Sequence, residues 1–249
     1  MPVRNEGMNL KTMIRILKAT VDVPHELLIV YDSADDDSIP VIDQMSEEYP
    51  QLRAVYNQIG RGVTKAIKAG IAAASGDTLL VLAADDIGPV LTIEEMTTLM
   101  DQGCDLVSAT RYAHGGRVLG GPWMSRFLSR LANRLFYLVS GTVLTDSTVG
   151  IKMFRKEIFQ ELNIQSNVGW SCAFELAIKS QLNGHQLGEV PIISINRFYG
   201  GKSSFKLGSW VVEYSKIFLW GIKSLYLSGK LKPQAALRIP RRLNLTRKK

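Results

Sequence analysis

Short apolar runs alternate along the chain with longer segments that have helical spacing. The runs with the length and composition of strands buried on both faces are 26–32, 52–57, 77–83 and 105–110. The helical patterns between them cover about 6–19, 38–48, 63–75 and 92–102. Repeated strand–helix units of this kind predict an α/β fold, with a mostly parallel central sheet flanked by helices.

After residue 110 this regular alternation stops. The remaining patterns predict an amphipathic helix at 122–140, a strand at 149–155, a helix at 170–183 and a strand at 189–198. The segment 209–228 is apolar but contains Glu213, Lys216 and Lys223, which argue against a membrane-spanning helix. We expect it to form amphipathic helices at an interface.

The first residues resemble the end of a strand and its following turn without the strand itself. Either this strand is very short or the chain begins a few residues late. No signal peptide is visible, because polar residues, Arg4 to Glu6, already occur within the first six positions.

The basic charge is concentrated at the C-terminus. The chain has 249 residues, a length that suits one large α/β domain, alone or with a small appendage. Its formal net charge is +7. Residues 230–249 contain eight Lys or Arg and no acid, and the rest of the chain has 22 basic and 23 acidic residues. A basic tail can contact an anionic membrane or nucleic acid, or be a solvated tail.

Cysteines and histidines give no pattern of a disulfide framework or a zinc site. Cys104 and Cys172 lack metal-ligand spacing, and the three histidines are scattered. A reducing compartment fits best.

Carboxylates end two of the predicted strands. Asp85 and Asp86 follow the run 77–83, and Asp32 ends the run 26–32. Ligands of such sheets bind at the carboxyl ends of the strands. Carboxylates there can hold a hard cation that shares its ligands with substrate phosphates, or they can be solvated turn residues.

Cations and glycines provide two weaker signals for phosphate. The turn 57–62 places two glycines and Arg61 before a predicted helix, whose N-terminus favours an anion. Arg126, Arg130 and Arg134 form one stripe on the helix 122–140. This stripe is either a solvated face or a site for phosphates or lipid headgroups.

Together these motifs resemble family 2 glycosyltransferases, and within them the dolichol-phosphate mannose synthase group. The resemblance covers about residues 2–207 and rests on ordered motifs. These are Pro2 to Gly7, Val30 to Asp36, Asn57 to Gly62, Ala83 to Asp85, Thr110 to Gly116, Asp146 to Lys152, Glu189 to Ile192, Arg197, and Gly201 to Ser203. The family implies a GT-A type fold.

Three positions depart from the family pattern. Ala83 replaces the first Asp of the metal motif, Ile87 replaces a nearby Gln, and Tyr31 replaces the first Asp of the nucleoside motif. A metal would then depend on Asp85, with help from Asp86, and on the substrate diphosphate, because Mg²⁺ can be held by one carboxylate and phosphates.

The resemblance implies inverting transfer of a hexose from a nucleotide-diphospho-sugar, either GDP-mannose or a UDP-sugar, to a polyprenyl or dolichyl phosphate. It implies Mg²⁺ or Mn²⁺ as the cofactor, bound by Asp85. The residues implied as catalytic are Asp85, Arg111 and Arg197. Those implied on the donor side are Asn5, Glu6, Asp32, Arg61, Asp86 and Ser203, and those on the acceptor side are Arg117, Arg126 and Asp146.

The same reading divides the chain into a catalytic domain, 1–207, and interfacial helices with a basic tail, 208–249. We expect a peripheral enzyme on the cytoplasmic face of a membrane. Its expected partners are the nucleotide sugar, the polyprenyl phosphate and an anionic membrane surface, with room for a membrane-anchoring partner protein but not nucleic acid.

Other functions stay open at this point. The changes at Ala83, Ile87 and Tyr31 would suit a catalytically degenerate relative that binds nucleotide sugars. A family 2 transferase with a saccharide acceptor would need an acidic base, for which the segment 174–176 offers only Glu175. A sugar nucleotidyltransferase shares the α/β layout, but the glycine-rich lysine signature is missing near the N-terminus.

Overall fold

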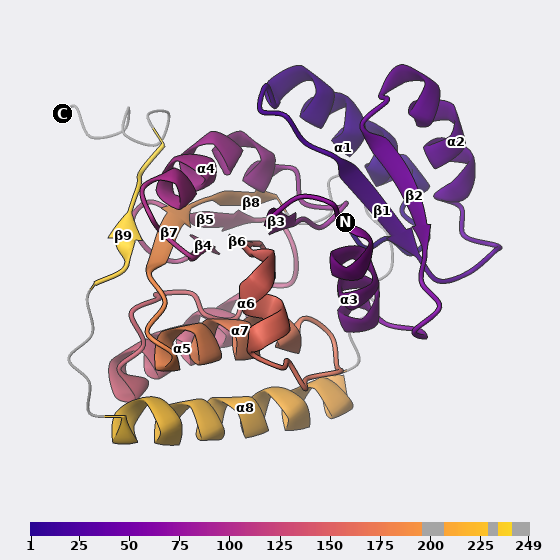
Figure 1. The fold of residues 1–249 in the computed structure, drawn as a ribbon. Coiled ribbons are helices and arrows are strands. Elements are labelled where there is room, and N and C mark those ends of the chain that lie inside the picture. The colour runs from indigo at the N-terminus through magenta and orange to yellow at the C-terminus, as the bar shows by residue number, and fades with distance from the viewer. Residues whose placement is uncertain (196–206, 229–233, 241–249) are drawn as a thin grey trace.

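The computed structural model describes residues 1–195, 207–228 and 234–240. Its helices are α1 (Gly7–Thr20), α2 (Ile39–Glu48), α3 (Val63–Ala73), η1 (Gly88–Thr92), α4 (Ile93–Asp101), α5 (Trp123–Ser140), α6 (Lys156–Glu161), α7 (Ser171–Leu182) and α8 (Leu207–Leu227). Helices cover the strands on several sides, and α8 runs along one edge of the molecule beside α5 and α7 (Figure 1). The predicted α/β class with flanking helices is confirmed.

The described strands form three groups. These are β1 (Leu27–Tyr31) with β2 (Leu52–Tyr56); β3 (Thr78–Val81), β6 (Lys152–Arg155), β4 (Leu106–Thr110), β7 (Leu187–Pro191) and β9 (Ala236–Leu237) in that order; and β5 (Arg117–Leu119) with β8 (Ile193–Ile195). Strand β6 is antiparallel to both of its neighbours, and every other pairing is parallel. Most of the strand pairings are therefore parallel, as predicted, but the two pairings that β6 makes inside the larger sheet are antiparallel.

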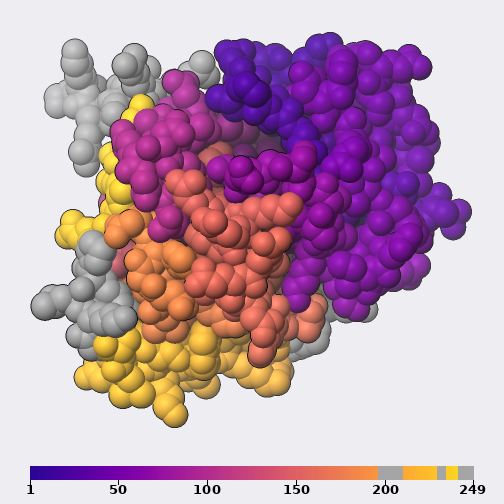
Figure 2. Space-filling model, in the orientation of Figure 1, coloured from indigo at the N-terminus to yellow at the C-terminus, as the bar shows by residue number. Residues whose placement is uncertain are grey.

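The core follows the apolar pattern of the sequence. One buried cluster joins α1, α2 and β1 to α4 and the inner residues of the larger sheet. A second cluster packs α3, α6 and α7 against the other side of β4 and β6. In the space-filling view the N-terminal segments occupy one side of the molecule and contact the remainder closely (Figure 2).

Three local predictions need correction. Residues 209–228 belong to the single helix α8, not to a pair of helices. The predicted strand 189–198 is divided into β7 and β8, which join different sheets. Part of the basic tail is ordered, since Ala236 and Leu237 pair with β7 as β9.

The first residues do run beside β1. Pro2 forms a parallel bridge with Val30, and the Val3 amide donates to the Val30 carbonyl at 2.9 Å. The first described residues therefore pair with β1 as the end of a strand does.

Candidate active site

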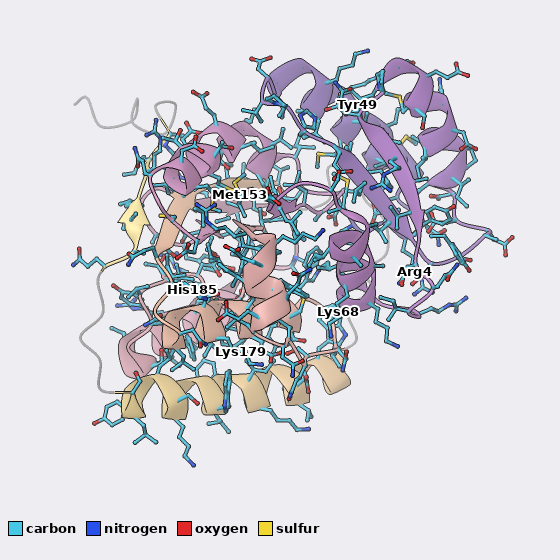
Figure 3. The ribbon with its side chains drawn as sticks, in the orientation of Figure 1. Arg4, Tyr49, Lys68, Met153, Lys179 and His185 are labelled. Carbon is cyan, nitrogen blue, oxygen red and sulfur yellow. The ribbon has the colours of Figure 1, made fainter. Side chains whose placement is uncertain are left out.

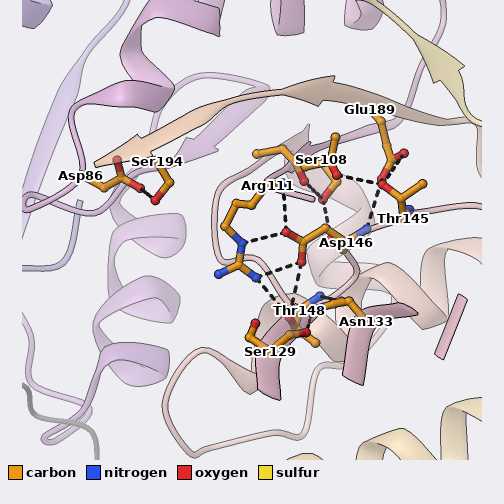
Figure 4. Close-up of polar contacts among 12 residues, drawn as sticks. Asp86, Ser108, Arg111, Ser129, Asn133, Thr145, Asp146, Thr148, Glu189 and Ser194 are labelled. Atoms are coloured by element: carbon orange, nitrogen blue, oxygen red, sulfur yellow. Dashed lines mark hydrogen bonds and ion pairs between the residues drawn. The ribbon is translucent and has the colours of Figure 1, made fainter. Parts of the chain in front are cut away.

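The two aspartates that follow β3 have different surroundings. The Asp86 carboxylate accepts hydrogen bonds from the Ser194 hydroxyl at 2.5 Å and the Ile195 amide at 2.9 Å (Figure 4). Burial raises the pKa of Asp86, although these hydrogen bonds oppose the shift. Asp86 thus holds β8 next to the segment that follows β3. The donor-side role expected for Asp86 from the sequence did not include this contact.

Asp85 is half-buried and makes no hydrogen bond or ion pair within the described part of the chain. No three His, Cys, Asp or Glu side chains of that part gather as a metal site. A divalent ion at Asp85 would therefore need most of its oxygen ligands from substrate, which a diphosphate can supply. The residues present fit a metal that arrives with its nucleotide.

Asp32 lies at the carboxyl end of β1 and contacts the glycine-rich turn. Its Oδ2 accepts a hydrogen bond from the Gly62 amide at 3.2 Å, immediately before α3. Its Oδ1 is buried and has no partner among the described residues. This open acceptor is suited to a donor such as a nucleoside hydroxyl or amide.

The turn before α3 is shaped by its own side chains. The Asn57 amide group donates to the Gly60 carbonyl at 2.7 Å and accepts from the Ile59 amide at 2.9 Å. Gly60 and Gly62 have φ of 121° and 118°, which side chains with a Cβ rarely adopt. Arg61 lies exposed between them and makes no polar contact with described residues.

The loop that carries Asn5 and Glu6 is held by acidic residues after β1. The Asn5 amide donates to Asp36 Oδ1 at 3.0 Å, and the Gly7 amide donates to Asp37 Oδ1 at 2.9 Å. The Glu6 amide donates to the Ser38 hydroxyl at 3.1 Å. The aspartates at 36 and 37 therefore organise the expected nucleoside loop, which the sequence did not indicate.

Arg111, whose side chain is 21% exposed, forms a bidentate ion pair with the fully buried Asp146 (Figure 4). Arg111 Nε and Nη2 donate to the two Asp146 oxygens at 2.7 and 2.9 Å, and its backbone amide donates to the same carboxylate at 3.1 Å. Burial alone would lower the pKa of Arg111, but the charge and hydrogen bonds of Asp146 raise it. Arg111 Nη1 has no partner among described residues, so the pair can still offer one donor to an anion.

This ion pair is connected to α5. The Thr148 hydroxyl accepts hydrogen bonds from Arg111 at 3.3 Å and from the Asn133 side chain at 2.7 Å. The Asn133 oxygen in turn accepts from the Thr148 amide at 3.3 Å. Asn133 is 2% exposed, so α5 is held to the ion pair by buried hydrogen bonds.

Two more buried ionisable groups lie next to the pair, and neither was assigned a role from the sequence. Glu189 accepts from the Thr145 amide at 2.6 Å, and burial raises its pKa to about 7. Lys152 donates to the Ser108 hydroxyl at 2.8 Å, and burial lowers its pKa to about 8. Both residues lie in motifs of the family resemblance, Asp146 to Lys152 and Glu189 to Ile192. That membership was the only signal in the sequence that could have marked them as functional residues.

The other acceptor-side candidates lie nearer the surface. Arg117 is exposed on β5, and Arg126 is half-buried and donates to the Val118 carbonyl at 3.4 Å. Arg130 and Arg134 are exposed further along α5. Arg197 and Ser203 lie outside the described residues.

Three comparisons with known proteins point to the same class of protein. Residues 1–162 match the family model described as glycosyl transferase family 2. The chain is 25% identical to a dolichol-phosphate mannosyltransferase of Pyrococcus furiosus, over 90% of this chain and 67% of that protein. It is 28% identical to a polyprenol monophosphomannose synthase of Mycolicibacterium smegmatis, over 89% of this chain and 85% of that protein.

A solved structure shares the fold. The glucosyl-3-phosphoglycerate synthase of Mycobacterium tuberculosis, solved with Mn²⁺, uridine diphosphate and glucosyl-3-phosphoglycerate, superposes with a TM-score of 0.61. Its identity is 16%, and the match covers 91% of this chain and 77% of that one. This likeness establishes the GT-A type of fold and no finer property.

Proposed function

The chain belongs to glycosyl transferase family 2, and from that premise we propose that it transfers a hexose from a nucleotide-diphospho-sugar to a polyprenyl or dolichyl phosphate. The printed names of two relatives that match about nine-tenths of the chain support this acceptor. The observation that carries the proposal is the uncommitted carboxylate of Asp85, which follows β3, together with the ion pair of Arg111 and Asp146 that follows β4. We keep both GDP-mannose and a UDP-sugar as donors.

The acceptor needs no strong base. A phosphate monoester is largely ionised near neutral pH, since its second pKa is about 6. Its oxygen attacks the anomeric carbon, the bond from that carbon to the diphosphate breaks, and the nucleoside diphosphate leaves with the electron pair. The sugar configuration is inverted. The proposed reaction therefore needs no carboxylate to act as its base.

The negative charge of the leaving diphosphate must be neutralised. The side chains needed for transfer are therefore those that bring positive charge to it. A divalent ion such as Mg²⁺ or Mn²⁺, held by Asp85 and the diphosphate, would supply positive charge at the leaving group. Arg61 and Arg197 are the donor-side cations that we expect to assist. Asn5, Glu6, Asp32 and Ser203 would contact the nucleotide, and Asp86 would position the neighbouring strand β8.

Arg111 is the cation best fixed in place. Two of its guanidinium nitrogens are held by Asp146, which reduces the entropy lost when Nη1 contacts a phosphate. We propose that Arg111 binds the lipid phosphate together with Arg117 and Arg126. Asp146 then acts by orienting Arg111, because both of its oxygens are already engaged.

We also propose that the enzyme docks on an anionic membrane surface through α5 and α8. None of the described helices is both long and apolar enough to cross a membrane. Trp123, Phe127, Leu128 and Leu138 of α5 are between 54% and 67% exposed, beside the arginine stripe. Exposed apolar and basic side chains on one helix are typical of interfacial helices.

Two of the four Trp and Tyr residues of α8 are exposed enough to act as aromatic anchors at a membrane surface. Trp220 and Tyr226 are exposed, by 38% and 74%. Trp210 and Tyr214 instead stack on each other, and Tyr214 stacks on Phe174 of α7. We therefore assign the larger share of docking to α5. The cytoplasmic face remains our proposed location.

A saccharide acceptor is less well supported. Glu175, the acid that the segment 174–176 offers as its base, is ion-paired with Lys179 at 2.7 Å and accepts hydrogen bonds from Ser166. Burial opposes ionisation, but these partners lower the pKa of Glu175 below its usual value. Lys68 and Lys179, labelled in Figure 3, hold the same loop by donating to its carbonyls.

The second candidate is a relative that binds nucleotide sugars without turnover. Ala83 favours it, because the metal motif retains one usable carboxylate. Metal-dependent transfer of labelled sugar to a polyprenyl phosphate separates the two candidates. Nucleotide binding without any product would support the second.

A further inference from the structure

A pair of tyrosines lies at the carboxyl ends of two neighbouring strands. Tyr31 ends β1 and Tyr56 ends β2, and the two residues are partners in the parallel register of these strands (Figure 1). Their ring centroids are 5.5 Å apart, and the ring planes are tilted by 60°. Ligands of parallel α/β sheets bind at the carboxyl ends of the strands. The ring pair therefore lies where this type of fold binds its ligands.

The two rings differ in how far they are buried. Tyr31 is half-buried and packs against the apolar cluster that contains α1 and α2, whereas Tyr56 is 51% exposed. Neither hydroxyl makes a hydrogen bond with a described residue. The core thus holds one ring, and this ring supports a second one whose surface is half open. An open aromatic ring offers a flat apolar surface on which another ring can stack.

The residue after each tyrosine belongs to the polar surroundings of the turn before α3. Asp32 Oδ2 accepts a hydrogen bond from the Gly62 amide at 3.2 Å. The Asn57 side chain donates to the Gly60 carbonyl at 2.7 Å. This turn precedes a helix N-terminus, which favours an anion such as a phosphate. A nucleotide whose sugar or phosphates contact the turn therefore has the two tyrosine rings within reach of its base.

We propose that Tyr31 and Tyr56 form a stacking platform for the nucleobase of the donor. This inference rests on the proposed function, since it takes the donor to be a nucleotide sugar. Stacking on an aromatic ring holds a base by its flat face and depends little on the hydrogen-bonding edge of the base. A purine covers more of the Tyr56 ring than a pyrimidine does. The platform therefore favours purine nucleotides over UDP and discriminates weakly between GDP and ADP.

The platform also gives a role to the tyrosine that departs from the family pattern. A carboxylate at position 31 would be a charged acceptor for the N–H groups on the edge of a base, whereas a phenol hydroxyl is a neutral and weaker one. Tyr31 thus loses an edge contact but adds ring surface beside Tyr56. The change at Tyr31 then alters how the base is bound, and it does not by itself indicate a catalytically degenerate relative.

The experiment measures binding of GDP, ADP, UDP and pyrophosphate to the full chain by titration calorimetry, with Mg²⁺ and without an acceptor. We expect GDP and ADP to bind within about fivefold of each other, and both more tightly than UDP. Tyr56→Leu should weaken GDP and ADP by at least about tenfold and leave pyrophosphate unchanged. The matched variants Tyr56→Phe and Tyr31→Phe keep the rings and should retain most of the affinity. Thermal unfolding of each variant verifies that it is folded.

Unchanged affinity for GDP in Tyr56→Leu would overturn the platform, as would an equal loss for pyrophosphate or tighter binding of UDP than of both purine nucleotides. A preference for GDP over ADP of more than about tenfold that survives in Tyr56→Leu would also overturn it, because the edge of the base would then be recognised elsewhere. Binding that depends on Tyr56, without transfer to a polyprenyl phosphate, would overturn the proposed function and support the platform. No binding of any nucleoside diphosphate would overturn both.

Discussion

At the residue scale, the adjacent aspartates after β3 have separate tasks. Asp86 accepts from Ser194 and Ile195 and holds β8, whereas Asp85 makes no hydrogen bond or ion pair with described residues. We expect Asp85→Asn to reduce transfer by at least about 100-fold, roughly 3 kcal/mol of transition-state stabilisation. Its Tm should stay near that of the parent protein. Steady-state transfer and thermal unfolding measure both quantities.

Asp86→Asn is the matched control for that experiment. It weakens hydrogen bonds that a charged acceptor makes to β8, so unfolding should become easier by about 1–2 kcal/mol. Full activity in Asp85→Asn, with the loss confined to Asp86→Asn, would remove Asp85 as the metal ligand.

A second residue-scale prediction concerns the pair of Arg111 and Asp146. Asp146 is fully buried, so Arg111→Ala would leave an unpaired charge and cost about 3 kcal/mol of stability. Adding Asp146→Asn should recover part of that stability but no activity, because Arg111 is assigned to the lipid phosphate. Urea unfolding and transfer assays of both variants test this. Recovery of activity in the double variant would show that Arg111 has only a structural role.

Glu189 predicts a dependence of stability on pH. Its carboxyl has a pKa raised to about 7 by burial, against an ordinary 4.5. Between these values the unfolded chain has lost a proton that the folded chain retains, so rising pH favours unfolding. The stability of the parent relative to Glu189→Gln should therefore fall by up to about 3 kcal/mol from pH 4.5 to 7.

Glu175→Gln provides the control of opposite sign. The pKa of Glu175 is lowered, so its contribution is present above pH 4.5 and is lost only in more acidic solution. The difference between parent and Glu175→Gln should be constant from pH 4.5 to 7. Urea unfolding across that range measures both variants, and parallel curves for the two would refute the assignment at Glu189.

Sequence alone could predict which residues lie at strand ends but not what each one contacts. Asp32, Asp85 and Arg111 follow strands whose apolar runs are unmistakable. The different roles of Asp85 and Asp86 depend on β8, which lies more than 100 residues later. The same holds for the aspartates at 36 and 37, whose partners are backbone amides near residue 5.

At the scale of helices and strands, α5 combines a buried side with exposed apolar residues. One of its sides supplies buried Asn133 and Phe136, while Leu128 and Leu138 are more than half exposed. We expect Leu128→Glu with Leu138→Glu to weaken binding to vesicles of phosphatidylcholine and phosphatidylserine by at least about tenfold. Vesicle co-sedimentation measures the change, and Tm should be nearly unaffected.

Leu91→Glu is the matched control, because Leu91 is similarly exposed on η1. It should bind vesicles like the parent. Equal weakening by both changes, or none by the α5 variant, would contradict docking through α5.

Helices and parallel strands were predictable at this scale because their apolar periods are set locally. The antiparallel direction of β6 was not, since an apolar run carries no information about its partner. The division of 189–198 was also missed, although Pro191 lies at the break: Pro191 closes β7 at its pairing with Thr110, and Ile193 then joins β5.

At the scale of the whole molecule, the residues of the proposed site follow the strand ends, and α5 would join that proposed site to an apolar, basic surface. The link is the buried set of hydrogen bonds from Asn133 through Thr148 to Arg111. A nucleotide sugar and a lipid phosphate could thus meet near the pair of Arg111 and Asp146. Charge suits this arrangement, since α5 and residues 230–249 contain basic residues and no acid.

The most direct test is transfer of labelled sugar from GDP- and UDP-sugars to a polyprenyl phosphate, with Mg²⁺ or Mn²⁺ and with a chelator. We predict product from one donor, abolished by the chelator and by Asp85→Asn. No product from any donor, in a preparation that still binds nucleotide, would contradict the proposed transfer and indicate a relative that binds nucleotide sugars without turnover.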